Sequence, residues 1–124
     1  MGTAIERALL ALSALAGLMA VALGAFGAHA FGDSLSTKQI DWWDTASFYL
    51  LTHAAVGIAI SISSRAHKLC RAGIIMVSGA IWFTATLYSM ALGAPTWLGA
   101  LTPIGGAAMI AGWAMILLSA LRSR

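Results

Sequence analysis

The sequence predicts an all-α integral membrane protein, a bundle of four transmembrane helices whose N- and C-termini are both cytoplasmic. Two observations lead to this prediction. Of the 124 residues, 60% are hydrophobic and only 9% are charged, which is too few polar side chains to cover a soluble domain of this size. The charges are also spread unevenly, because residues 8–32, 45–64 and 72–121 contain no Asp, Glu, Lys or Arg. Long uncharged and apolar runs are typical of membrane spans.

These uncharged runs determine the number of helices. A helix rises about 1.5 Å per residue, so about 20 residues cross the roughly 30 Å of hydrocarbon in a bilayer. The first two runs each fit one crossing. The third is divided at Gly93-Ala94-Pro95-Thr96, because glycine followed by proline is typical of a helix end. We therefore predict one transmembrane domain, residues 1–124, with helices at about 8–31, 45–64, 71–92 and 97–121.

Two helix starts carry signals of their own. Ser36 and Gln39 have the spacing of a capping box, which allows the second helix to begin before it enters the lipid. The pair Trp42-Trp43 is then expected at headgroup depth, as interfacial tryptophans are. Thr102-Pro103 resembles an N-cap followed by the first helical position. Whether residues 96–102 belong to the fourth helix therefore stays open.

The basic residues predict the orientation. With four crossings, six of the seven Lys and Arg residues fall on one side of the membrane and Lys38 falls on the other. The six are Arg7, Arg65, Lys68, Arg71, Arg122 and Arg124. Short cytoplasmic segments are enriched in Lys and Arg, so this side is expected to be the cytoplasm. The same residues form no basic stripe, so we expect no binding to nucleic acid.

Small residues predict where the helices touch. Helix association in lipid depends on close packing, which small side chains permit. In the first helix, Ala16, Ala20, Gly24 and Ala28 recur every fourth residue and predict one continuous ridge. The residues to which we assign helix packing are Ala20, Gly24, Gly27, Gly105, Gly106 and Gly112. The sequence leaves open whether these contacts lie within one chain or between protomers.

Several motifs together resemble a known family. They are the stretch from Gly24 to Ala30 (GAFGAHA), Trp43 to Ala46 with Tyr49 and His53, Leu87-Tyr88, Leu98 to Gly106 (LGALTPIGG), and Gly112-Trp113. In this order and spacing they resemble the YgdD/YwdK family of small membrane proteins, which has no assigned biochemical activity. The chain differs at Ala85-Thr86, where that family usually has Gly-Ser, and at Thr52, where it often has Tyr. The resemblance implies a four-helix, multi-pass protein of the bacterial inner (plasma) membrane and supplies no mechanism.

Two histidines lie inside the expected spans, where an ionisable group is costly unless it is paired. Helical spacing puts His29 and His53 on small or polar faces, so both are expected to point into the bundle. We interpret them as hydrogen-bonded bridges between helices, with proton or ion handling and metal binding as the alternatives. His53 is expected near the middle of the bilayer, neutral at pH 7, with Tyr49, Thr84 or Tyr88 as its partner.

The other polar candidates lie near the ends of the expected helices. Asp33 follows His29 by four residues and could share its helix face, and Asp44 precedes the second span. Carboxylates and histidine together can bind cations. We favour solvated residues of the outer loop and predict no metal site. Thr102 is a further polar candidate because it occupies the expected helix start.

The motifs of catalysis are missing from the sequence, which has no Gly-x-Ser-x-Gly and no Walker lysine. We therefore predict no enzyme, no catalytic residue and no cofactor. The leading hypothesis is a structural or accessory protein that stabilises the membrane or attaches to a larger membrane complex. The alternative is a small transporter or channel, an oligomer that uses His29 and His53. The expected partners are the lipid bilayer and either further copies of the chain or a larger membrane protein complex.

Overall fold

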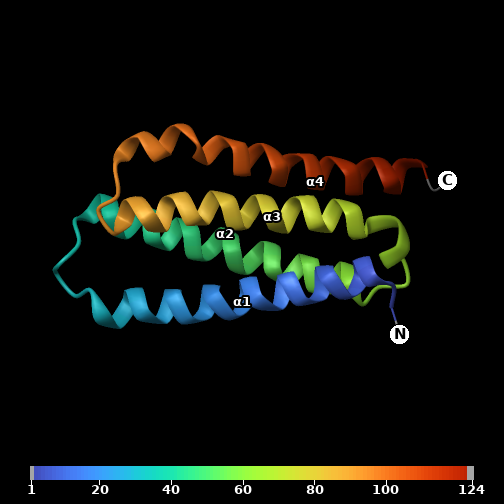
Figure 1. The fold of residues 1–124 in the computed structure, drawn as a ribbon, viewed down its shortest axis with the longest axis horizontal. Coiled ribbons are helices and arrows are strands. Elements are labelled where there is room, and N and C mark those ends of the chain that lie inside the picture. Colours follow the sequence, from blue (N-terminus) through green and yellow to red (C-terminus); the bar gives the residue numbers. More distant parts are fainter. Residues whose placement is uncertain (1, 123–124) are drawn as a thin grey trace.

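The computed structural model describes residues 2–122, and four long helices make up most of that part of the chain (Figure 1). Its elements are α1 (Ala4–Ala30), α2 (Thr37–Ser61), α3 (Ala66–Ala91), the short 3₁₀ helix η1 (Thr96–Ala100) and α4 (Thr102–Arg122). The predicted all-helical fold is confirmed. Arg124, which contributed to the predicted orientation, lies outside the described residues.

The first three helices begin earlier than the charge pattern suggested. Both α1 and α2 begin at a capping box, in which the cap side chain and the N3 side chain bond to each other's backbone N–H. At α2, Ser36 Oγ accepts from the Gln39 N–H at 3.2 Å, and Gln39 Oε1 accepts from the Ser36 N–H at 2.9 Å. The capping box predicted at Ser36 is confirmed. Consequently the charged residues Lys38, Asp41 and Asp44 belong to the first two turns of α2.

The connection between α3 and α4 answers the question about residues 96–102. After α3 the chain turns at Gly93, whose φ of +99° lies in the left-handed region that glycine tolerates best. Pro95 precedes η1, and the Leu101 N–H bonds to the Leu98 carbonyl at 2.9 Å. The helix α4 then starts anew at Thr102. Residues 96–100 are therefore a separate 3₁₀ turn.

Three helices pack around one another, and the fourth lies at the side. In Figure 1 the helices run back and forth along one direction, and the described ends of the chain lie at the same end of the molecule. The helices α1, α2 and α3 all contact one another. Within residues 2–122, α4 brings no Cα within 8 Å of α1 or α2 and packs on α3 and η1 alone. The arrangement is therefore a three-helix core with α4 attached to α3, which is more open than the bundle we expected.

Glycines allow the close contact between α3 and α4. A Cβ added at Gly105 would lie 2.5 Å from the Gly79 carbonyl oxygen, and one added at Gly112 would lie 2.9 Å from the Ala72 carbonyl oxygen. Real side-chain atoms do not approach a backbone so closely, so both positions need glycine. A Cβ at the neighbouring Gly106 would meet nothing within 4 Å. Gly106, which we had assigned to packing, therefore faces open space.

The expected ridge along α1 is buried over only part of its length. Ala16 and Ala20 are buried, Gly24 is half-buried and Ala28 is exposed. Each residue turns a helix by about 100°, so a spacing of four drifts by about 40° at every step and the ridge leaves the contact line. The contact with α2 continues instead at Gly27, where an added Cβ would collide with the Trp43 indole.

A second close contact lies deeper in the core. Ser13 of α1 is fully buried against Gly57 of α2, where an added Cβ would collide with the Ser13 hydroxyl. Within residues 2–122 this hydroxyl has no hydrogen-bond partner. Leu9, also fully buried, lies against Gly73 of α3. Small residues of α2 and α3 therefore admit the side chains of α1.

Length and composition mark three segments that could cross a membrane. They are Ala4–Ala30, Ala66–Ala91 and Thr96–Arg122, which correspond to α1, α3 and η1 with α4. The helix α2 is not among them, since its first turns are polar. The core of the molecule nevertheless places α2 against both α1 and α3.

The two neighbouring glycines of α4 give a matched test of this packing. We expect Gly105→Ala to lower the thermal midpoint of the protein in mild detergent by several degrees, because its methyl group would meet the α3 backbone. The control Gly106→Ala adds the same methyl group in open space and should leave the midpoint unchanged or higher, since alanine favours helix over glycine by roughly 1 kcal/mol. Equal midpoints for the two variants would contradict the α3–α4 contact.

Candidate functional site

A buried polar side chain in the middle of the helices is His53 of α2, which is 7% exposed. Its Nδ1 lies 2.7 Å from the backbone carbonyl oxygen of Tyr49, one turn earlier in the helix. Its Nε2 lies 3.2 Å from Nε1 of Trp113 on α4. Both nitrogens of the ring therefore have partners on two different helices.

These partners indicate which ring nitrogen donates and which accepts. A carbonyl oxygen can only accept a hydrogen bond, and an indole N–H can only donate one. Nδ1 must therefore carry the proton that it donates to the Tyr49 carbonyl, and Nε2 must be the acceptor for Trp113. In a doubly protonated ring, the Nε2 proton would face the Trp113 N–H. The arrangement accordingly fits the ring that carries its proton on Nδ1.

The bond to Trp113 also ties two helices that do not otherwise meet. Over the described residues no Cα of α2 lies within 8 Å of a Cα of α4, so the His53 and Trp113 side chains make the contact between these helices. The rings meet edge to face, with centroids 6.1 Å apart. Trp113 was not predicted as a partner. The sequence did contain a signal for this bond in the Gly112-Trp113 motif. An indole N–H within an apolar span needs an acceptor, and His53 is one of the few polar side chains available.

The three residues expected as hydrogen-bond partners of His53 bond to other groups or through other atoms. The Tyr49 ring stacks on the imidazole with centroids 5.9 Å apart, but it is the carbonyl of Tyr49 that accepts the bond. Thr84 Oγ1 donates to the Ile81 carbonyl of its own helix. The Tyr88 hydroxyl lies 2.9 Å from Ser47 Oγ. The pairing of His53 with Thr84 or Tyr88 was therefore a wrong prediction, because both hydroxyls are bonded elsewhere.

A second tie lies nearer the end of the molecule that carries the α1–α2 loop. Trp43, which is 3% exposed, donates from Nε1 to the Leu23 carbonyl of α1 at 2.8 Å. Its ring meets Phe31 and Tyr88 edge to face at 4.9 and 4.6 Å between centroids. The indole of Trp43 occupies the space that Gly27 leaves, so this ring is buried between helices. Trp97, by contrast, is 64% exposed.

A third tie joins the start of α4 to α3. Thr102 Oγ1 and Thr86 Oγ1 lie 2.7 Å apart, and both side chains are buried. The Thr86 hydroxyl also lies 2.8 Å from the Phe83 carbonyl, and the Thr102 hydroxyl lies 3.2 Å from the Leu98 carbonyl. Thr86 is one of the positions at which the chain departs from the family pattern, and here it supplies a buried hydroxyl to the tie.

The remaining candidates do not come together as a site. His29 occupies the last turn of α1, where it is exposed, so the expectation that it points into the bundle is wrong. Asp33 lies past the end of α1 at Ala30, so the two residues share no helix face. Asp44 is exposed on α2. Among the described residues, no group of three or more His, Cys, Asp or Glu side chains could hold a metal ion.

The fold and these ties define a helical membrane protein with several apolar spans, in which buried polar side chains connect one helix to the next. A family model described as a protein of unknown function (DUF423) matches residues 23–106, and the chain belongs to this family. The matched segment contains Trp43, His53 and Thr102 but ends before Trp113. No solved structure matches the chain.

Relatives at about one-third identity carry membrane-protein names. A UPF0382 membrane protein of Haemophilus influenzae is 36% identical over 87 residues, covering 68% of this chain and 70% of the relative. One of Staphylococcus epidermidis is 36% identical over 83 residues, covering 65% and 68%. The UPF0382 inner membrane protein YgdD of Escherichia coli K12 is 32% identical over 90 residues, covering 70% and 69%. The resemblance to the YgdD family and the inner-membrane location are thus confirmed.

The tie between α2 and α4 can be tested at Trp113. We expect Trp113→Phe to lower the unfolding free energy in detergent by about 0.6–1.7 kcal/mol, because it leaves His53 Nε2 buried without a donor. The control Trp97→Phe makes the same substitution at an exposed ring and should have little effect. Nitrogen-15 spectra of labelled histidine should show protonated Nδ1 in the unchanged protein. A proton on Nε2 instead would contradict the tie.

Proposed function

We propose that this protein is a structural or accessory protein of the inner membrane, not an enzyme and not a carrier of ions. The observation that carries the proposal is the state of His53. One of its nitrogens is bonded to a carbonyl and the other to an indole N–H. A histidine that passes protons needs a nitrogen accessible to a proton donor and an acceptor beyond it. His53 instead serves as a link between helices.

Other polar groups within the helices support the same conclusion. The hydroxyls of Thr52, Thr84 and Ser89 each lie within hydrogen-bond distance of a carbonyl three or four residues earlier in their own helix. Such bonds satisfy the hydroxyl inside the helix that carries it. They leave few polar groups to line a hydrated path. His29 and His53, which the transport alternative would combine, lie at a helix end and within the core respectively.

We also propose that α2 crosses the membrane, which makes four crossings and places both termini on one side. Its 25 residues extend about 38 Å, enough for the bilayer core. Its charged residues lie within the first two turns, which would project into the headgroups. Its buried face lies against α1 and α3. The excess of basic residues near the termini and the α2–α3 loop supports a cytoplasmic position for that end.

The topology can be tested with reporter fusions. A reporter that is active only in the periplasm should be silent after Arg124 and active when inserted near Ser36. The reason is the six-to-one distribution of basic residues together with the even number of crossings. A fusion after Gly93, in the loop between α3 and α4, should also be active. Activity at the C-terminus would contradict both the orientation and the number of crossings.

The position of α4 supports the accessory role. Because α4 packs on α3 alone, much of its surface faces outward, including Ile110, Leu117 and Leu121. In the membrane these side chains face either lipid or another membrane protein. Such a surface suits attachment to a larger complex or to further copies of the chain, and it needs no pathway through the molecule.

Transport can be tested in proteoliposomes that contain a trapped pH-sensitive dye. With a proton gradient and a potassium ionophore, we expect the protein to admit protons no faster than protein-free vesicles do. His53→Gln should leave this background unchanged and retain most of the folded protein, since an amide both donates and accepts. His29→Gln serves as the control at an exposed histidine. Proton flux that is lost in a well-folded His53→Gln protein would establish the transport alternative.

A further inference from the structure

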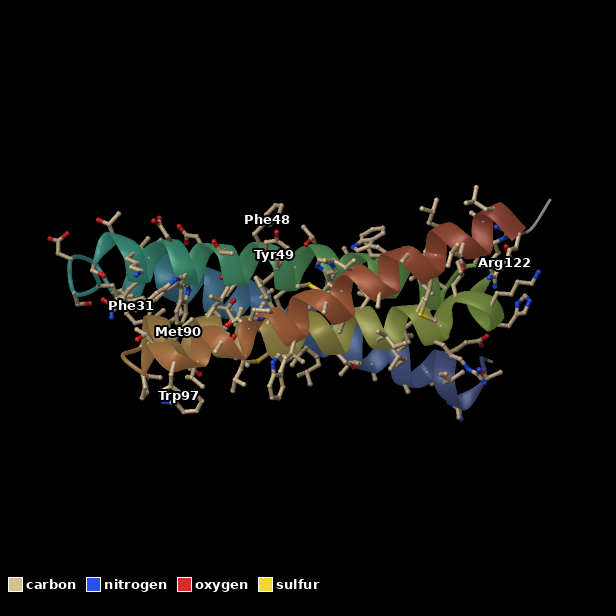
Figure 2. All side chains as sticks on the ribbon, turned by 90° about the horizontal axis from the view of Figure 1, so that it is seen from above. Phe31, Phe48, Tyr49, Met90, Trp97 and Arg122 are labelled. Carbon is tan, nitrogen blue, oxygen red and sulfur yellow. The ribbon has the colours of Figure 1, made fainter. Side chains whose placement is uncertain are left out.

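A cleft lies between the first turn of α3 and the last two turns of α4, at the end of the molecule that carries the described ends of the chain. Its volume is about 480 Å³, and it is lined by Lys68, Met115, Leu118, Ser119 and Arg122. Figure 2 shows Arg122 at this end, opposite to Phe31 and Trp97. Pockets of roughly 300–1,000 Å³ are typical of sites for small ligands.

The chemistry of the cleft changes with depth. On α4, the spacing of Met115, Leu118 and Arg122 places them on one helix face, in order from the interior toward the helix end. Lys68, in the first turn of α3, faces them across the cleft. The inner wall is therefore apolar and the rim carries two cations. An amphiphile with an anionic head and an apolar tail matches this arrangement, because its head would meet the cations and its tail the apolar wall.

Among the described residues, no carboxylate is paired with the two cations of the rim. Within residues 2–122, neither Lys68 nor Arg122 forms an ion pair. Their positive charge is thus available to an anion in the cleft. A free phosphate would use only the rim and leave Met115 and Leu118 without a role, whereas a phospholipid would use both parts. Basic pockets between helices on the cytoplasmic side are known to receive anionic lipid headgroups.

We propose that this cleft binds one anionic phospholipid. Its phosphate lies between Lys68 and Arg122, and the first part of an acyl chain follows Met115 and Leu118. The inference rests on the proposed topology, which puts the cleft at headgroup depth, and does not depend on whether the protein transports anything. The lipid would cover the gap left where α4 meets only α3, and so fix the free end of α4 to the core.

Native mass spectrometry of the detergent-purified full chain tests the proposal. The probes are palmitoyl-oleoyl phosphatidylglycerol and phosphatidylcholine, which share their acyl chains and differ in charge. We expect one bound phosphatidylglycerol, with an affinity about tenfold above that for phosphatidylcholine, since each cation contributes electrostatically at the surface. The double variant Lys68→Gln with Arg122→Gln should lose this preference. Millimolar inorganic phosphate should not displace the lipid, because it cannot use the apolar wall.

The matched control is Arg7→Gln with Arg65→Gln, which removes the same charge near the same end of the molecule but outside the cleft. It should retain the preference. Equal loss in both double variants would show a diffuse charge effect and overturn the site, as would equal binding of the two lipids or displacement by phosphate. Phosphatidylglycerol should also raise the thermal midpoint of the unchanged protein more than phosphatidylcholine does, and this readout needs no variant. An equal rise would contradict the proposal.

Discussion

The close approach of α3 to its neighbours is the constraint on which the rest of the molecule depends. In lipid, apolar side chains gain little by leaving one apolar surface for another, so helices associate only where their surfaces fit closely. The side chains of Leu9 and Ser13 enter the core beside Gly73 and Gly57, and on the other face of α3 the backbone of α4 rests on Gly79. The central position of α3 follows from its own glycines, Gly73 toward α1 and Gly79 toward α4.

The polar ties act on helices that this packing has already brought together. Trp43 bonds α2 to α1, His53 and Trp113 bond α2 to α4, and the threonine pair 86 and 102 bonds α3 to α4. Such bonds contribute on average about 0.6 kcal/mol each in a membrane, so none of them could assemble the fold alone. Their effect is to define the rotation of each helix about its axis, because each tie joins particular groups of two helices at one depth.

The sequence predicted the helices better than it predicted their contacts. The number of helices, the capping box at Ser36 and the break at Gly93 followed from local signals that a single segment contains. The charge pattern alone put the start of α2 at residue 45, because charges mark where lipid ends, whereas the capping box at Ser36 marked where the helix itself begins. The burial of Trp43, the exposure of His29 and the partnership of Trp113 depend on which faces meet. That information lies in pairs of distant residues, and hydropathy along one segment does not contain it.

The lateral position of α4 has a consequence for biosynthesis. All contacts among α1, α2 and α3 are made by residues that precede Leu92, so this core is complete in sequence before the ribosome reaches α4. Until α4 arrives, His53 Nε2 has no indole N–H to accept from, and the glycine-lined face of α3 has no helix against it. The nascent chain therefore passes through a stage in which a polar acceptor and a backbone-deep groove face the same side of the core. When α4 docks, Trp113 donates to His53 Nε2 and the α4 backbone covers the glycines of α3. The last helix to be synthesised therefore completes the packing of the core.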